Sequence, residues 1–524
     1  MQFVPAAHTT QNWQLTKPSA TGRRGIVVSQ ARPAAEAGVA ILEAGGNAID
    51  AAVGTALALA SQEPWNSGIG GIGFCVVHRA GQASAEVVDF GPVAPRHTRP
   101  DQYKLTGRMT TDLFAWAEVE DDANIHGPMS VAIPSSVAGY HKLHSTWGKL
   151  PLAEVMAPAV ALAKRGLPLD WYTTLKIAMS AAVLAKYPES ARVYLRNGLP
   201  PVPPYQGTPG FFTQGNLAAT LEHLQRAGLR DYYEGDVARA LVEDFATVGS
   251  HIDATDLTNC QARIVPAVEV PWRNGNVLQL ATGLTAAPTL MRVLERMADA
   301  QWGAAPDAAW FTTLARVMKD AYAERLTGLG EADRNAAETC TTHLTVCDAE
   351  GTMVAMTTTL MSSMGSRVLM PKTGVLLNNG MMWFDPRPGQ ANSVAPGKRP
   401  LCNMCPIVMK HDGAPVAAIG ASGGRRIMAS VFQVLSFHAD FGMTVEAAAH
   451  HPRIDVSSAD DVTADRRLSA DILAALAAAG PIEIVEATSV PINFACPNII
   501  VQDADGGRIG ISDVASPWSA AVAQ

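Results

Sequence analysis

Residues 339–360 read TCTTHLTVCDAEGTMVAMTTTL and contain two alternating runs joined by a short polar segment. Apolar and polar residues alternate over 344–347 in the first run, and MVAMTTTL forms the second. Alternation of this kind, interrupted by DAEG at 348–351, predicts a β-hairpin. The hairpin opens with two adjacent threonines, Thr341 and Thr342, about two thirds of the way along the chain.

The hydroxyl of Thr341 becomes a useful nucleophile only if Thr341 is the first residue of its own chain. An internal threonine lacks a base, whereas an N-terminal threonine can pass its hydroxyl proton to its own α-amine. Thr341 could free itself by attacking the carbonyl of Cys340, with water opening the resulting ester. The polar stretch GEADRNAAETC, residues 330–340, would then lead into the cut. Threonine pairs also begin strands simply because β-branched residues favour them, so spacing alone leaves both interpretations open.

The rest of the chain predicts strands paired within each half and helices outside them, which indicates a layered α+β sandwich. Gly45-Gly46 are expected to end one helix, and Asn47 to cap the next. The expected elements are a strand at 25–30, helices at 32–44 and 48–60, a glycine loop and strand at 66–79, a further strand and helices within 129–165, mainly helices from 166 to 330 with a strand at 275–282, and strands from 341 onward with helices near 427–449 and 468–479.

Composition excludes several classes of protein. The 524 residues are 48% hydrophobic and 17% charged, which is typical of a globular chain. A net charge of −8 without any run of Lys or Arg argues against a nucleic-acid partner. No apolar run approaches the length of a membrane span and the N-terminus has no signal-like apolar segment, so we expect no membrane association and a cytoplasmic location. The seven widely spaced cysteines do not suggest a disulfide framework.

Two further motifs do not predict a metal or a cofactor. Cys402 and Cys405 form a C-x-x-C pair, but no second pair or histidine motif stands at a suitable distance. Gly68, Gly70 and Gly73 match G-x-G-x-x-G, the pattern of a dinucleotide-binding loop. Such a loop follows a strand and opens a helix, whereas here an expected helix precedes the loop and a strand follows it. We therefore expect neither a bound metal nor a cofactor.

Several segments together resemble the γ-glutamyltranspeptidase family of N-terminal nucleophile hydrolases, over nearly the whole chain. The resemblance implies a four-layer αββα sandwich and a precursor that cuts itself into a large subunit, residues 1–340, and a small subunit, residues 341–524. The two subunits would form one αββα domain, a heterodimer whose further dimerisation stays open. The segments are EAGVAILEAGGNAIDAAVGTALAL (36–59), EPWNSGIGGIGF (63–74), TTHLTVCDAEGTMVAMTTTL (341–360), GVLLNNGMMWF (374–384), PGKRPLCNMCPIV (396–408) and GASGGRRI (420–427).

The resemblance also assigns catalytic roles. Thr341 corresponds to the nucleophile, and Thr359 to the second threonine, which orients it. Gly423 and Gly424 correspond to the glycine pair whose backbone N–H groups stabilise the oxyanion of the tetrahedral intermediate. The cut would fall between Cys340 and Thr341.

The chain departs from the family where a glutamyl group would bind. Glutamyl enzymes of the family hold their substrate with polar and charged residues, and most of these positions are apolar or lack a side chain in this sequence. Without charge-assisted contacts to a carboxylate, selectivity for glutamate should be lost. The changed positions, which we expect to line the substrate site, are Gly91, Met361, Gly380, Trp383, Cys402 and Asn403.

A filled, dry cleft suits a small or an apolar acyl group. The chain's length and expected lack of a signal resemble the oxamate amidohydrolases of purine (uric acid) degradation, which implies hydrolysis of oxamate to oxalate and ammonia. Arg367, Arg425, Arg426 and Asn403 are candidates to bind the carboxylate. The alternatives are a cephalosporin-acylase-like amidase, a γ-glutamyltransferase or glutathione hydrolase with a rebuilt site, and a catalytically dead homologue that only binds.

Overall fold

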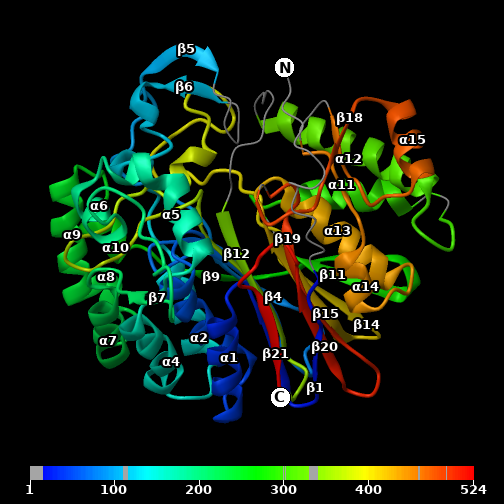
Figure 1. Cartoon of the computed structure of the whole chain (residues 1–524), viewed down its shortest axis with the longest axis horizontal. Helices are drawn as coiled ribbons and strands as arrows, with labels where there is room; N and C mark the ends of the chain where they lie inside the picture. Colours follow the sequence, from blue (N-terminus) through cyan, green and yellow to red (C-terminus); the bar gives the residue numbers. More distant parts are fainter. Residues whose placement is uncertain are drawn as a thin grey trace.

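A computed structural model describes residues 16–109, 116–281, 283–298, 300, 302–329, 340–457, 461–490 and 492–524 of the chain (Figure 1). The side chains of residues 326–329 and 340 fall outside this description. Residues 330–339, which make up most of the expected lead-in to the cut, and residues 1–15 fall outside the description entirely.

The predicted hairpin forms the centre of a seven-stranded sheet, which confirms the expectation from residues 339–360. All neighbouring strands of this sheet are antiparallel. In spatial order they are β21 (Ala520–Ala523), β2 (Gly25–Ser29), β12 (Cys340–Asp348), β13 (Met353–Met361), β3 (Ile72–His78), β4 (Glu86–Phe90) and β9 (Arg263–Pro266).

A second antiparallel sheet of seven strands stacks on the first. The layer between the sheets is apolar, because one buried cluster contains Val28 and Ala355 of the first sheet together with Val408 and Ile500 of the second. The strands are β1 (Ala20–Gly22), β20 (Arg508–Ser512), β19 (Cys496–Gln502), β15 (Ala414–Ser422), β14 (Ile407–His411), β11 (Asn276–Leu280) and β10 (Val268–Pro271).

Helices cover the outer face of each sheet, as Figure 1 shows. One apolar core joins the first sheet to α1 (Arg32–Glu43), α2 (Ala48–Gln62), α3 (Ser136–Trp147) and α4 (Leu152–Arg165). Another joins the second sheet to α11 (Ala287–Ala298), α12 (Ala308–Leu329), α13 (Arg426–Ala439) and α14 (Val445–His450). The order helices, sheet, sheet, helices is the four-layer αββα sandwich.

The remaining elements extend the helical layers and form small sheets at the periphery. None of the helices in the described part of the chain is both long and apolar enough to cross a membrane. These elements are α5 (Trp171–Leu184), α6 (Pro188–Tyr194), α7 (Leu217–Ala227), α8 (Asp231–Glu234), α9 (Asp236–Val248), α10 (Ala254–Thr258), α15 (Ala470–Ala479), η2 (Glu120–Asp122), η3 (Pro128–Ser130), η4 (Arg273–Gly275), η5 (Gly380–Trp383), β5 (Leu105–Met109), β6 (Ala117–Val119), β7 (Leu167–Pro168), β8 (Phe211–Phe212), β16 (Ile454–Asp455), β17 (Val462–Asp465) and β18 (Ile482–Val485).

The predicted caps between α1 and α2 are confirmed. The N–H of Gly45, which has a φ of +95°, donates to Leu42 O, and the N–H of Gly46 donates to Ile41 O. This pair of bonds is the Schellman motif that a glycine favours at a helix end. Asn47 then accepts hydrogen bonds from the first turn of α2 and completes a capping box with Asp50.

The expectation of a strand near residue 130 is wrong. Residues 131–135 join η3 to α3 outside any ladder. The N–H of Ala132 donates to the side chain of Asn378 at 3.1 Å, and the N–H of Ile133 donates to Val93 O at 3.0 Å. The backbone N–H groups of this segment therefore bind a side chain and a loop carbonyl instead of a neighbouring strand. Alternation in the sequence could not reveal these partners.

Candidate active site

Thr341 lies at an irregularity in the pairing of β12 with β13. Cys340 is opposite Met361 and Thr342 is opposite Thr358, with a shift of register between the two pairs. Met361 has a φ of +90°, which is strained for a residue other than glycine. Irregularities of this kind redirect side chains and occur frequently beside active sites.

The irregularity brings the hydroxyl groups of Thr341 and Thr359 together. Their Oγ1 atoms are 3.2 Å apart, and both side chains are buried. Thr359 Oγ1 also accepts the N–H of Met361 at 2.7 Å. Either hydroxyl can donate in the contact between Thr341 and Thr359, so the contact can hold the oxygen of Thr341 in place.

The neighbouring threonine, Thr342, binds a buried carboxyl group that the sequence analysis missed. Thr342 Oγ1 donates to Glu63 Oε2 at 2.5 Å, and Asn66 Nδ2 donates to the other oxygen, Oε1. Burial raises the pKa of Glu63 to about 7, although the hydrogen bond from Thr342 and the charge of Lys176 oppose the shift. Glu63 begins the quoted segment EPWNSG, but nothing in that segment indicates a contact with a residue 279 positions later.

His343 links the two sheets behind the threonines. Its Nδ1 lies 2.9 Å from Thr357 Oγ1, and its carbonyl accepts a hydrogen bond from Asn498 Nδ2. Complete burial lowers the pKa of His343 to about 3, so the ring is neutral near pH 7. A Cβ placed on Gly420 would lie 2.7 Å from Nε2 of this ring, so only a glycine fits at position 420.

Gly423 and Gly424 form the turn between β15 and α13. Their φ angles are +132° and +60°, and a Cβ on Gly423 would lie 2.7 Å from Cβ of Ala495. The backbone at the start of a helix favours negative charge, which is the requirement of an oxyanion site. Gln30, which follows β2, donates to Ser422 Oγ, so the end of β15 lies beside the end of β2, the strand that neighbours β12.

Three of the expected substrate-site residues are buried in apolar surroundings. Met361, Trp383 and Cys402 belong to one buried cluster, which also contains Phe74 and Met382. A glutamyl group would find no charged partner among these three side chains.

Gly380 and Asn403 lie at the border of this cluster. A Cβ on Gly380 would be 2.9 Å from Cβ of Ala132, so packing leaves no room for a side chain there. Asn403 Oδ1 accepts a hydrogen bond from Arg325 at 3.2 Å, while its Nδ2 is buried without a partner in the described part of the chain. The Nδ2 group is thus a donor that a bound molecule could engage.

The arginines chosen from the sequence to bind a substrate carboxylate form hydrogen bonds with other parts of the chain. Arg367 donates to Ser362 Oγ and Gly365 O, and Arg426 donates to Ile492 O. Arg425 lies at the start of α13, where its carbonyl accepts the hydroxyl of Tyr322.

Two arginines that the sequence analysis did not select contact positions that we expected to line the substrate site. Arg325 donates to Cys402 O at 2.7 Å. Arg399 lies beside Gly91, since a Cβ on Gly91 would be 2.6 Å from one of its terminal nitrogens. Arg399 belongs to the quoted segment PGKRPLCNMCPIV, whereas no sequence pattern marked Arg325.

Among the described residues, no group of three or more His, Cys, Asp or Glu side chains is placed to hold a metal ion. The described site instead offers two hydroxyl groups, a glycine turn at a helix start and an apolar cluster. These are parts suited to acyl transfer through a threonine ester.

Comparisons with known proteins agree with this chemistry. The sequence model of the family described as Gamma-glutamyltranspeptidase matches residues 34–340 and 330–523. The chain is 32% identical over 474 residues to an acylase ACY 1 proenzyme of Pseudomonas sp. (strain V22), covering 84% of this chain and 83% of that one. It is 27% identical over 568 residues to a glutathione hydrolase proenzyme of Bacillus subtilis (strain 168), covering 94% and 92%.

Among solved structures, a cephalosporin acylase from Bacillus halodurans superimposes with a TM-score of 0.84 over 100% of this chain and 99% of that one. The two sequences are 22% identical, so the likeness establishes the fold.

Proposed function

The chain belongs to the gamma-glutamyltranspeptidase family, and within it we propose that Thr341 is the nucleophile of a self-processing amidohydrolase. The family places the chain among N-terminal nucleophile hydrolases, and its relatives are acylases and glutathione hydrolases. The observation that carries the assignment to Thr341 is the 3.2 Å contact between the hydroxyl groups of Thr341 and Thr359.

Maturation would cut the chain between Cys340 and Thr341. The two relatives described above are proenzymes, which supports cleavage of a precursor into subunits. After such a cut the central sheet would contain β2, β3, β4 and β9 from residues 1–340, and β12, β13 and β21 from residues 341–524. Because β12 pairs with β2 and β13 pairs with β3, the subunits would remain a heterodimer held by backbone hydrogen bonds.

The cycle of the mature enzyme would proceed through an ester. Thr341 Oγ1 attacks the amide carbonyl while the α-amine of Thr341 takes the hydroxyl proton. The N–H groups of Gly423 and Gly424 stabilise the oxyanion, and the proton then goes to the departing nitrogen as the C–N bond breaks. Water attacks the ester, releases the carboxylic acid and restores the hydroxyl of Thr341.

We propose a small amide as the substrate, and oxamate in particular, which would yield oxalate and ammonia. Met361, Trp383 and Cys402 are buried in an apolar cluster, and their side chains offer a longer polar acyl chain no charged partner. The buried and unpaired Nδ2 of Asn403 is a donor that the carboxylate of oxamate could use. A glutamyl substrate would bring two charged groups to the same apolar surroundings, where an unpaired charge costs several kcal/mol.

A second candidate is an acylase that removes an apolar acyl group. The same apolar cluster favours it, and so does the identity of 32% to the acylase ACY 1 proenzyme. The two candidates differ in the acyl group that they accept, and they share every catalytic step.

A substrate panel separates the candidates. Purified mature enzyme is assayed for release of ammonia or amine from oxamate, γ-glutamyl anilide and anilides of straight-chain fatty acids, with Thr341→Ala as the blank. We expect kcat/KM for oxamate to exceed that for γ-glutamyl anilide by a factor on the order of 10³, since each 1.4 kcal/mol is about tenfold.

The other outcomes are equally informative. Activity on fatty acyl anilides without activity on oxamate would replace oxamate by the acylase assignment. Equal or higher activity on γ-glutamyl anilide would show that other residues have rebuilt a glutamyl site. Wild-type rates no greater than those of Thr341→Ala on every amide would contradict the assignment of Thr341.

A further inference from the structure

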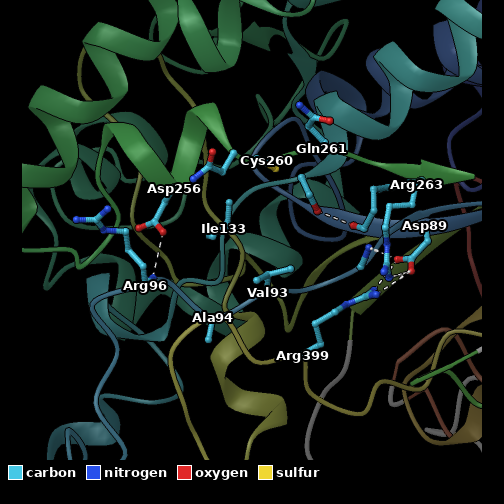
Figure 2. Close-up of a pocket in the computed structure, with 15 residues that line it drawn as sticks. Asp89, Val93, Ala94, Arg96, Ile133, Asp256, Cys260, Gln261, Arg263 and Arg399 are labelled. Carbon is cyan, nitrogen blue, oxygen red and sulfur yellow. Dashed lines mark hydrogen bonds and ion pairs between the residues drawn. The ribbon is translucent and has the colours of Figure 1, made fainter.

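A cavity of ≈ 280 Å³ lies between β4, β9 and the loop that precedes α3. Its lining includes the buried apolar residues Phe90, Ala94 and Ile133, of which Figure 2 labels Ala94 and Ile133. Its rim is polar and includes Arg263 and Gln261, both exposed. The volume lies just below the roughly 300–1,000 Å³ of sites for drug-sized ligands, so the cavity suits a smaller molecule.

Two arginines share one carboxylate at the rim. Asp89 accepts hydrogen bonds from both terminal nitrogens of Arg399, at 2.8 and 2.5 Å, and from Arg263 at 2.8 Å, as the dashed lines in Figure 2 show. Burial alone would raise the pKa of Asp89, but the hydrogen bonds and charge of Arg399 outweigh it and lower the pKa, so Asp89 is ionised at pH 7. One negative charge therefore faces two positive charges.

The other charged groups of the lining do not remove this surplus. Arg96 forms an ion pair with Asp253, which lies outside the cavity, at 3.1 Å. Asp256 accepts the backbone N–H of Arg96 at 3.0 Å, on the side of the cavity away from Arg263 and Arg399 (Figure 2). Arg263 keeps 62% of its side chain exposed, so its guanidinium remains accessible at the mouth of the cavity.

Gly91 and Phe74 separate this cavity from the apolar cluster of the candidate active site. Gly91 lines the cavity, and a Cβ there would lie 2.8 Å from Cε2 of Phe74. Phe74 belongs to the same cluster as Met361 and Trp383. The cavity is therefore a neighbour of the cluster with an aromatic ring between them.

We propose that the cavity is a binding site for a small carboxylic acid with an apolar body, such as an aromatic or a six-carbon acid. The apolar part would cover Phe90 and Ile133, and the carboxylate would lie between Arg263 and Arg399. A carboxylate meets arginine through charge-assisted hydrogen bonds of good geometry, whereas a neutral molecule of the same shape gains only the apolar contact. The proposal concerns binding alone and does not depend on which amide the enzyme hydrolyses.

The test is isothermal titration of the purified full-length protein with benzoate and hexanoate. Benzyl alcohol serves as the neutral counterpart of benzoate, and acetate as a carboxylate without an apolar body. We expect benzoate to bind at least tenfold more tightly than either control compound. Binding should weaken as NaCl is raised, because the rim is partly open to solvent.

Variants locate the site. Arg263→Gln removes an exposed cation and should weaken benzoate by a factor on the order of ten, the size of one charge-assisted hydrogen bond. Gln261→Glu adds a negative charge at the rim and should also weaken benzoate, without a matching effect on benzyl alcohol. Arg79→Gln is the matched control, because Arg79 forms an ion pair with Glu86 beside the turn between β3 and β4 and does not line the cavity.

Two outcomes would overturn the proposal. One is equal affinity for benzoate and benzyl alcohol, which would leave the arginines without a role. The other is an unchanged affinity for benzoate in both Arg263→Gln and Gln261→Glu, which would place the bound acid elsewhere in the protein.

Discussion

The hydroxyl oxygen of Thr341 lies 3.2 Å from that of Thr359, and the oxygen of Thr359 accepts the backbone N–H of Met361 at 2.7 Å. The two threonines are 18 positions apart on paired strands, and the shift of register beside Thr341 brings them together. Either hydroxyl can be the donor in this contact. We propose on this basis that Thr359 positions the proposed nucleophile.

Replacing Thr359 by valine should therefore lower kcat on the best substrate by roughly 10²-fold while KM changes little, the pattern of an interaction gained in the transition state. Valine keeps the size and branching of threonine and loses only the hydroxyl. Thr359→Ser, which keeps the hydroxyl, should retain most of the activity. If Thr359→Val has the wild-type kcat, the hydroxyl has a structural role alone.

Processing should depend on the hydroxyl of Thr341. We expect mass spectrometry of the purified wild-type protein to give two chains spanning residues 1–340 and 341–524, and the Thr341→Ala protein to give one. The physical reason is that the same hydroxyl attacks the carbonyl of Cys340 and creates the free α-amine. A mature small chain that begins at any residue other than Thr341 would contradict the prediction.

Gly420→Ala should destabilise the protein by about 1–3 kcal/mol, the usual range for overpacking a rigid core. The added methyl group would meet the ring of His343 between the two sheets, and complete burial gives the ring no room to move. Urea unfolding followed by circular dichroism gives the free energy of unfolding. Gly210→Ala is the control, because a Cβ at position 210 has no neighbouring atom within 4 Å.

The pH dependence of stability should report the buried carboxyl of Glu63. Burial raises its pKa to about 7, from the ordinary glutamate value of 4.5. A carboxyl group with a raised pKa in the folded state stabilises the fold below its unfolded pKa, and this contribution is lost as the pH rises through about 7. From pH 5 to pH 8 the free energy of unfolding should thus fall further in a protein with Glu63 than in Glu63→Gln, by up to about 3 kcal/mol.

The comparison is best made in the Thr341→Ala background, in which the chain stays uncut and no new α-amine appears near Glu63. The groups around the carboxyl are Thr342, Asn66, Trp65 and Lys176, and all of them are unchanged in Glu63→Gln. Parallel pH profiles of the two proteins would show that Glu63 is ionised throughout this range.

Local patterns in the sequence predicted what depends on neighbours along the chain. Alternation predicted the hairpin of β12 and β13, and Gly45 with Asn47 predicted the junction of α1 and α2. The resemblance to a family added two expectations: the four-layer order of helices and sheets, and the roles of Thr341 and Thr359 as a catalytic pair. What stayed hidden depends on contacts between distant segments.

The contacts of Glu63 and His343 illustrate the limit. Glu63 meets Thr342 from the end of a helix 279 positions earlier, and His343 meets Gly420 from the facing sheet. Neither contact leaves a periodic signal, because each involves one side chain and one partner. The expected strand near residue 130 failed for the related reason that its backbone groups bind Asn378 and Val93 instead of a ladder.

Trp383 should limit the size of the acyl group. Its side chain is 4% exposed and packs in the cluster with Met361 and Cys402, so Trp383→Leu would open space there. Each additional buried methylene contributes about 0.8 kcal/mol, so two or three of them correspond to a gain on the order of tenfold or more. We expect the ratio of kcat/KM for the hexanoyl anilide to that for the acetyl anilide to rise by that factor in Trp383→Leu. Trp171→Leu, at an exposed position on α5, is the control and should leave the ratio unchanged. The same ratio in Trp383→Leu and wild type would show that the acyl group binds away from the cluster.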